Sequence, residues 1–261
     1  KRKAEFNETR IPKRRFLVNS AITRGERSIC YFVDLKEQNK LLLKRIQAGE
    51  FIALHGPRAS GKSTQALMIQ EQLQEEGFIC IYASFEQVNI RDGTDVFWQT
   101  LGKALQRDAT EFLGPLEHLK IKTASDFLDM FHRTKWKFSD AVLILDEFDT
   151  LYNATEDVLN SCLTTFRSIK SKKDDYFIHS MVAIGPFSIL YIDSKRLTTS
   201  PFNVKTPFQN QNFTLDQVHT LYNEFTEEYA LIIDLQVIED VFMQTNGYAI
   251  SKSELLETIL T

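Results

Sequence analysis

The chain has 261 residues, of which 43% are hydrophobic and 25% are charged, and its formal net charge is −4. This length suits one large α/β domain, or one domain with a small satellite. No run approaches the ~18–20 apolar residues that a membrane span needs, so we expect no membrane partner. Because the sequence opens at Lys1 rather than at a methionine, we expect it to be a piece of a longer protein.

The three cysteines, Cys30, Cys80 and Cys162, are odd in number and far apart, and none forms a CxxC pair. This spacing indicates neither a zinc site nor a disulfide framework. Three reduced thiols are typical of the cytoplasm or the nucleus, which is where we expect the protein to act.

Charge is concentrated at the start, where the first fifteen residues hold seven basic and two acidic side chains. We predict a basic arm over residues 1–30. Such an arm can contact nucleic acid or act as a nuclear address, or it can be a solvated linker, and we favour the linker. The acidic remainder argues against a broad nucleic-acid-binding face.

From residue 31 onward, short apolar runs alternate with amphipathic stretches. A capping box of Asp34 and Glu37 predicts the first helix, and Ser125 is the predicted cap of a later one. The continuous apolar runs predict strands that are buried on both faces. The predicted strands are 51–54, 78–83, 141–145, 177–184 and 202–208. The predicted helices before and between them are 34–48, 62–76, 94–108, one starting at 125, and 156–170.

Strands separated by helices predict an α/β fold with a mostly parallel central sheet between two helical layers, in residues 31–210. The last fifty residues change in character. Helix starts at Thr214 (with Gln217), at Asp234 and at Ser251 predict a small lid-like helical subdomain over residues 211–261.

Residues 56–63 read Gly-Pro-Arg-Ala-Ser-Gly-Lys-Ser and match GxxxxGK[ST] at every fixed position. The match lies between a predicted buried strand and a predicted helix, the context that a phosphate-binding loop requires. The fold is therefore expected to be the three-layer sandwich of P-loop nucleoside triphosphatases. The predicted nucleotide contacts are Gly56, Pro57, Arg58, Ala59, Ser60, Gly61, Lys62, Ser63 and Thr64.

Each residue type in this loop has a physical role. Glycines let the backbone N–H groups curl around a phosphate at the N-terminus of the next helix. Lys62 would reach the β- and γ-phosphates as a point charge, and the Ser63 hydroxyl is a predicted Mg²⁺ ligand because hard cations take oxygen ligands. Thr64 would support the α-phosphate.

The apolar strand 141–145 runs into Asp146, Glu147 and Asp149. Asp146 is expected to hold Mg²⁺ through water, beside the phosphate loop if strands 141–145 and 51–54 are neighbours. Glu147 and Lys62 are the predicted catalytic residues, and Glu147 is expected to polarise the attacking water. The alternative is that Glu147 and Asp149 are surface acids that follow a strand.

Weaker candidates surround this pair. Ser188, after the fourth strand, would sense the γ-phosphate or lie in an ordinary turn. Arg58 and Arg196 would neutralise charge in the transition state or be solvated. The five histidines show no ligand spacing, so no metal is assigned to them.

Four segments carry a resemblance to a known family: 31–34 (YFVD), 56–63, 145–149 (LDEFD) and 200–203 (SPFN). At these residues the chain resembles AAA+-like ATPases of the signal-transduction (STAND) and archaeal-ATPase type, and within them the nucleoside-triphosphatase domain of Crinkler-type effectors. The resemblance implies a glycine-rich strand flanked by the fourth and third strands, a helical lid and a separate effector domain. It also implies delivery to a host cell and action in its nucleus.

Together these features predict Mg²⁺-dependent binding and hydrolysis of ATP, or of GTP, that drives or resets a switch in a larger protein. The alternatives are a nucleotide-loaded scaffold with little turnover and a nucleotide kinase. The expected partners are the nucleotide, other domains of a longer chain and further copies of the chain. No clear arginine finger is evident in the tail, so the isolated domain is expected to turn over slowly.

Overall fold

The computed structural model describes residues 14–17, 20–113, 121–135, 140–192, 201–202 and 206–248. The chain forms two compact units. One comprises Leu35–Gln211, and the other combines Lys1–Asp34 with Asn212–Thr261. No helix among the described residues is both long and apolar enough to cross a membrane.

The first unit is built on a sheet of five strands in the order β2-β3-β4-β1-β5, and every pairing is parallel. The α/β class and the first four predicted strands are confirmed. The fifth strand has only two residues and lies at the end of the predicted range 202–208. The strands are β1 (Phe51–His55), β2 (Ile79–Ser84), β3 (Ala141–Asp146), β4 (Ile178–Gly185) and β5 (Phe208–Gln209).

The strand order corrects one expectation. β1 is flanked by β4 and β5, and β4 separates it from β3, so strands β1 and β3 are not neighbours. The register nevertheless brings their ends level, because Leu54 pairs with Ile184 and Leu145 pairs with the adjacent Ala183. Residues that follow β3, β4 and β1 therefore meet at one edge of the sheet, where α/β proteins bind their ligands.

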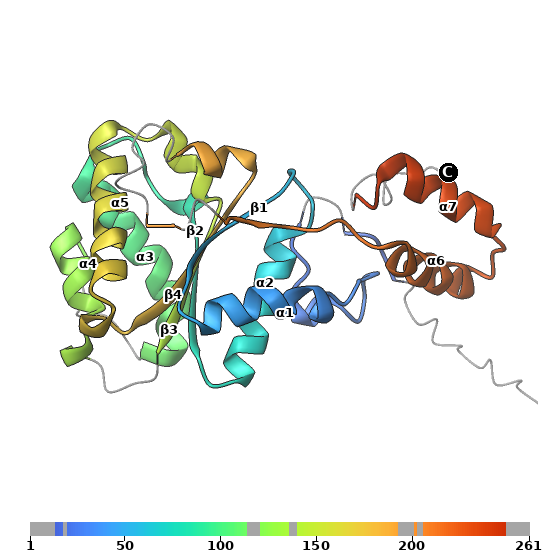
Figure 1. Cartoon of the computed structure of the whole chain (residues 1–261), viewed down its shortest axis with the longest axis horizontal. Coiled ribbons are helices and arrows are strands. Elements are labelled where there is room, and N and C mark those ends of the chain that lie inside the picture. Colours follow the sequence, from blue (N-terminus) through green and yellow to red (C-terminus); the bar gives the residue numbers. More distant parts are fainter. Residues whose placement is uncertain are drawn as a thin grey trace, which may run out of the picture. The chain divides into compact units, whose positions relative to one another are not determined.

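Helices cover both faces of the sheet (Figure 1). One apolar core unites the sheet with α1 and α2, and a second unites the opposite face with α3, α4 and α5. The helices are α1 (Lys36–Gln47), α2 (Lys62–Glu75), α3 (Thr94–Leu113), α4 (Ala124–Met130) and α5 (Glu156–Ser171). Short 3-10 turns lie at η1 (Arg24–Glu26), η2 (Phe85–Gln87), η3 (Arg133–Lys135), η4 (Phe148–Asn153), η5 (Lys173–Asp175) and η6 (Phe187–Tyr191).

Several residues of types that often take part in binding or catalysis are buried in the apolar core instead. Trp98 is 1% exposed in the α3 core and donates its indole N–H to Ser161 Oγ. Cys30, Cys80 and Cys162 are buried free thiols, as predicted for Cys80 and Cys162. Burial raises the pKa of Cys80 to about 12, which keeps this thiol protonated and unreactive.

Two predicted helix caps are wrong. The N-cap of α1 is Leu35 rather than Asp34, and the N-cap of α4 is Thr123 rather than Ser125. Thr123 is favoured because Asp126 completes a capping box with it, so that both residues satisfy backbone N–H groups at the helix start.

The second unit contains α6 (Leu215–Tyr229) and α7 (Leu235–Thr245). Their predicted caps are confirmed: Thr214 forms a capping box with Gln217, and the Asp234 side chain accepts from Gln236 N–H. The predicted helix at Ser251 lies outside the described residues.

We predicted a solvated linker over residues 1–30. From Arg14 onward, the described part of this segment instead packs against α6 of the same unit. Arg14 forms ion pairs with Glu224 and Glu228 of α6, at 2.5 and 2.9 Å. Tyr31 also donates its hydroxyl to Glu228 at 2.9 Å. These bonds tie the described part of the segment to α6, although each charge is partly exposed and the ion pairs themselves contribute little stability.

Candidate nucleotide-binding site

The loop between β1 and α2 has the backbone of an anion cradle. Gly61 is the N-cap of α2 with φ +83°, and Ala59 also has a positive φ, of +55°. Among the described residues, the backbone N–H groups of residues 59–63 have no hydrogen-bond acceptor. Free N–H groups at the start of a helix attract a phosphate group through hydrogen bonds and the helix dipole.

Lys62 places a buried positive charge inside this loop. Its side chain is 8% exposed, and its ammonium donates one hydrogen bond, of 2.6 Å, to the Pro57 carbonyl. Burial lowers the pKa of Lys62, and the carboxylates of Glu147, Asp146 and Asp149 partly offset this effect. An ammonium has three donors, so two remain for phosphate oxygens.

Asp146 and Ser63 supply the oxygen atoms that Mg²⁺ prefers. Asp146, at the end of β3, is 5% exposed. Its Oδ2 accepts a 2.6 Å hydrogen bond from the Tyr82 hydroxyl, and its Oδ1 accepts from the Glu147 N–H at 2.9 Å. The Ser63 hydroxyl makes no side-chain hydrogen bond to any described residue. A fixed carboxylate and a free hydroxyl therefore fit a magnesium ion.

Glu147 has a strained backbone at the point where the chain leaves β3. Its φ is +50° and its ψ +34°, a left-handed conformation that is uncommon outside glycine. The side chain is half-buried, and burial raises its pKa, with further contributions from Asp146, Asp149 and Glu86. Strain and a raised pKa are both typical of a catalytic base.

Asp149 is not the surface acid of the alternative interpretation. Its Oδ2 accepts a 3.2 Å hydrogen bond from Ser188 Oγ, and its buried Oδ1 has no partner among the described residues. A Cβ atom at Gly185 would lie 2.9 Å from this Oδ1, so the carboxylate packs where only glycine fits. Ser188 is thus held at the end of β4 by the acid that follows β3. Arg58 is exposed on the loop, and Arg196 lies outside the described residues.

Two residues of the site were not predicted. Tyr82, in β2, holds Asp146, and Asn210, directly after β5, is 4% exposed and holds the phosphate loop through Ser60. Neither belongs to a motif. The sequence offers only indirect indications of their roles. Tyr82 is a residue with a hydroxyl within the apolar strand 78–83, and Asn210 is an amide directly after a short strand.

The phosphate loop, the acids after β3 and the sheet that brings them together all agree with one family model. The model, described as an AAA domain, matches residues 45–179, which is more than half of the chain. The chain belongs to the AAA domain family. This family consists of P-loop nucleoside triphosphatases, and it supports nucleotide binding by this AAA domain. No curated protein matches the chain by sequence.

Solved structures share the fold of this AAA domain. The Walker-type ATPase PABY2304 of Pyrococcus abyssi is 15% identical, with a TM-score of 0.57 over 88% of this chain and 66% of that one. Aeropyrum pernix ORC2, in ADPNP–ADP complexes, is 12% identical, with a TM-score of 0.55 over 90% of this chain and 61% of that one. Aeropyrum pernix ORC1 in complex with DNA is 14% identical, with a TM-score of 0.56 over 86% and 59%. The chain therefore spans about three fifths to two thirds of the length of these proteins.

Proposed function

We propose that this AAA domain binds ATP with Mg²⁺ and hydrolyses it. The observation that carries the proposal is the buried Lys62 ammonium, which has two free donors inside a loop of free backbone N–H groups. A buried charge costs free energy unless a partner of opposite charge compensates it. The triphosphate of a nucleotide is the partner that this loop fits.

The acids and serines in and beside the loop would have separate chemical roles. Ser63 and Asp146 would hold Mg²⁺, which neutralises charge on the β- and γ-phosphates. Glu147, with its raised pKa, would orient the attacking water and accept its proton. Ser188 donates its single hydroxyl hydrogen to Asp149, so it would sense the γ-phosphate by exchanging that bond for one to a phosphate oxygen. Catalysis of this kind rests on position and electrostatics, with no covalent intermediate.

Hydrolysis in turn would drive or reset a conformational switch in a larger protein of the cytoplasm or nucleus. The support is the sequence resemblance to STAND-type and Crinkler-type ATPases and the division of the chain into two compact units.

Nucleotide binding can be tested on the chain itself. We expect ATP at a hundred times its dissociation constant to raise the melting temperature by roughly 5–10 °C, because ligand binding adds ~2.7 kcal/mol to the folded state. Titrations with ATP, GTP and their diphosphates, with and without Mg²⁺, measure the base preference. Phosphate release and phosphate transfer to nucleoside monophosphates distinguish an ATPase from a kinase, and binding without release indicates a scaffold. No shift with any nucleotide would contradict the proposal.

Tyr82 provides a test of the magnesium site. We expect Tyr82→Phe to raise the Mg²⁺ concentration needed for half-maximal phosphate release by about tenfold, because the hydrogen bond that orients Asp146 is lost. The measurement is a Mg²⁺ titration at saturating ATP. Tyr152→Phe, at a tyrosine that is 57% exposed, is the matched control and should leave the titration unchanged. An unchanged Mg²⁺ dependence in Tyr82→Phe would remove Tyr82 from the site.

A further inference from the structure

The phosphate loop is held from its outer side by one buried amide. Asn210 Nδ2 donates to the Ser60 carbonyl at 2.7 Å and to Ser60 Oγ at 3.0 Å. The backbone N–H of Asn210 donates to the carbonyl of His55, the last residue of β1, at 2.7 Å. Asn210 is thus bonded to the chain on both sides of Gly56, where the loop starts.

The bond to the Ser60 carbonyl also fixes the orientation of the N–H group of the next residue, Gly61. A peptide unit is planar and trans, so its C=O and the following N–H point in opposite directions. When Asn210 holds the Ser60 carbonyl, the N–H of Gly61 must point away from Asn210, and it has no acceptor among the described residues. Gly61 can take this position because its φ of +83° suits glycine, and its neighbourhood is open.

Packing shows that this clamp is tight. A Cβ atom on Gly56 would lie 3.1 Å from Asn210 Cβ and 3.1 Å from Ser60 Oγ. The first glycine of the motif is therefore needed here partly because Asn210 packs against it.

We propose that Asn210 is a positioning residue that sets the affinity of the loop for nucleotide phosphates. The inference deepens the proposed function and rests on it. A bound phosphate that accepts from the Gly61 N–H favours the peptide orientation that Asn210 holds. By linkage, the phosphate and the Asn210 bonds must then stabilise each other.

The test uses Asn210→Leu, which keeps the side-chain volume and removes the donor. We expect KM and Kd for ATP, and Kd for ADP and for inorganic pyrophosphate, to rise by about tenfold, because roughly 1.4 kcal/mol of hydrogen bonding is lost. The value of kcat should change by less than about threefold, because the Gly61 N–H would contact ground state and transition state alike. Asn212→Leu is the matched control, because it also removes an amide bond to a backbone carbonyl, that of Asn246.

The outcomes separate three cases. A purely structural role for Asn210 would lower the folded fraction, and with it the apparent kcat and binding stoichiometry, while Kd stayed constant. An unchanged Kd in a folded Asn210→Leu variant overturns the inference but leaves nucleotide binding intact. A wild-type protein that binds no nucleotide overturns the proposed function itself.

Hydrogen exchange on the wild-type protein tests the coupling between a bound phosphate and Asn210 even if the variant does not fold. We expect ADP to slow exchange of the Asn210 N–H, which is bonded to His55, by roughly the factor by which it stabilises the loop. Lys62→Ala should not show this slowing. Exchange at Asn210 that is unchanged by ADP, at concentrations that saturate the protein, overturns the coupling between the bound phosphate and Asn210.

Discussion

Lys62→Ala is expected to weaken ATP binding by at least about a hundredfold. Two free donors of a charged ammonium would bind phosphate oxygens, and hydrogen bonds to charged groups contribute roughly 1.5–3 kcal/mol each. The fold should persist, because the substitution removes a buried charge whose pKa burial already lowers, and only one internal hydrogen bond is lost. Calorimetric titration with ATP and Mg²⁺ measures the affinity, and a melting curve measures the stability.

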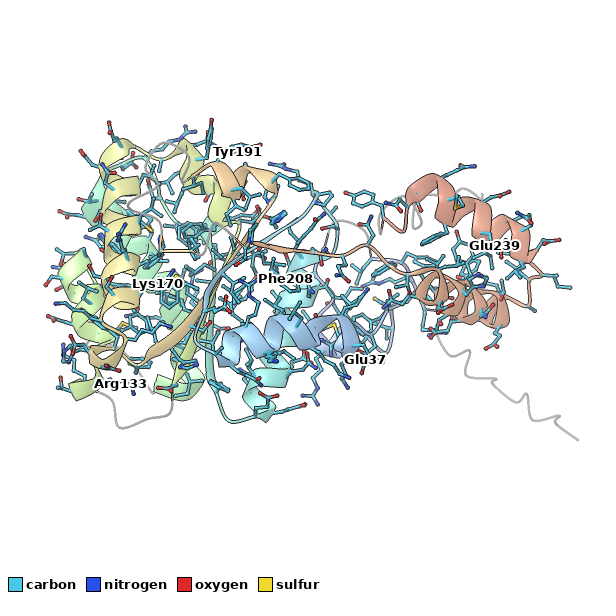
Figure 2. The ribbon with its side chains drawn as sticks, in the orientation of Figure 1. Glu37, Arg133, Lys170, Tyr191, Phe208 and Glu239 are labelled. Atoms are coloured by element: carbon cyan, nitrogen blue, oxygen red, sulfur yellow. The ribbon has the colours of Figure 1, made fainter. Side chains whose placement is uncertain are left out.

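Lys170 offers a matched control for this experiment. Its ammonium also donates to a proline carbonyl, that of Pro201, at 2.6 Å, and Figure 2 shows it on the side of the sheet covered by α5. Lys170→Ala removes the same charge and the same type of bond outside the loop, so ATP affinity should remain that of the wild type. ATP binding of wild-type strength in Lys62→Ala would show that the loop is not the phosphate site.

Local features of the fold could be predicted from the sequence because their causes are local. The GxxxxGK[ST] spacing specifies a loop between a strand and a helix, and the structure places a left-handed Gly61 directly before α2. Four short apolar runs became strands, as is typical of a sheet that is buried on both faces. The box of Thr214 and Gln217 starts α6 because both partners lie within one helical turn.

Features that depend on distant contacts could not be predicted. The sequence does not record that β4 lies between β1 and β3, because strand order is decided by how the crossover helices pack. Asn210 and Ser60 are 150 positions apart, and Tyr82 and Asp146 are 64 apart. In each pair a polar side chain is conspicuous only once its burial is known. Phe208, labelled in Figure 2, marks the short strand that brings Asn210 to the loop.

The same distinction applies to the acids after β3. The sequence identifies Asp146, Glu147 and Asp149 as candidate site residues. It does not show which side chains hold each carboxylate in place. The structure gives Asp146 a tyrosine and Asp149 a serine, whereas the Glu147 carboxylate has no hydrogen bond to any described residue. A carboxylate that is half-buried, has a raised pKa and has no internal partner is the one free to bind a water molecule.

Glu147→Gln is therefore expected to slow ATP hydrolysis by roughly a hundredfold or more while ATP and Mg²⁺ affinity stay near wild type, the usual effect of losing a positioned base. The amide keeps the size of the side chain, so the left-handed backbone and the packing are preserved. Single-turnover phosphate release measures the chemical step, and equilibrium titration measures binding. Glu86→Gln, at an exposed acid that also raises the pKa of Glu147, is the control and should slow hydrolysis by less than about threefold.

The pH profile gives this prediction a second readout. The base is active only as a carboxylate, and burial with Asp146 and Asp149 raises the pKa of Glu147, so the active form is lost on acidification at a higher pH than for an exposed glutamate. Wild-type turnover should fall along an acid limb that Glu147→Gln lacks, and Glu86→Gln should shift that limb to lower pH because one repelling charge is gone. Equal turnover in Glu147→Gln and wild type, or an identical acid limb in both, would show that another group activates the water and that the strain at Glu147 serves only the turn after β3.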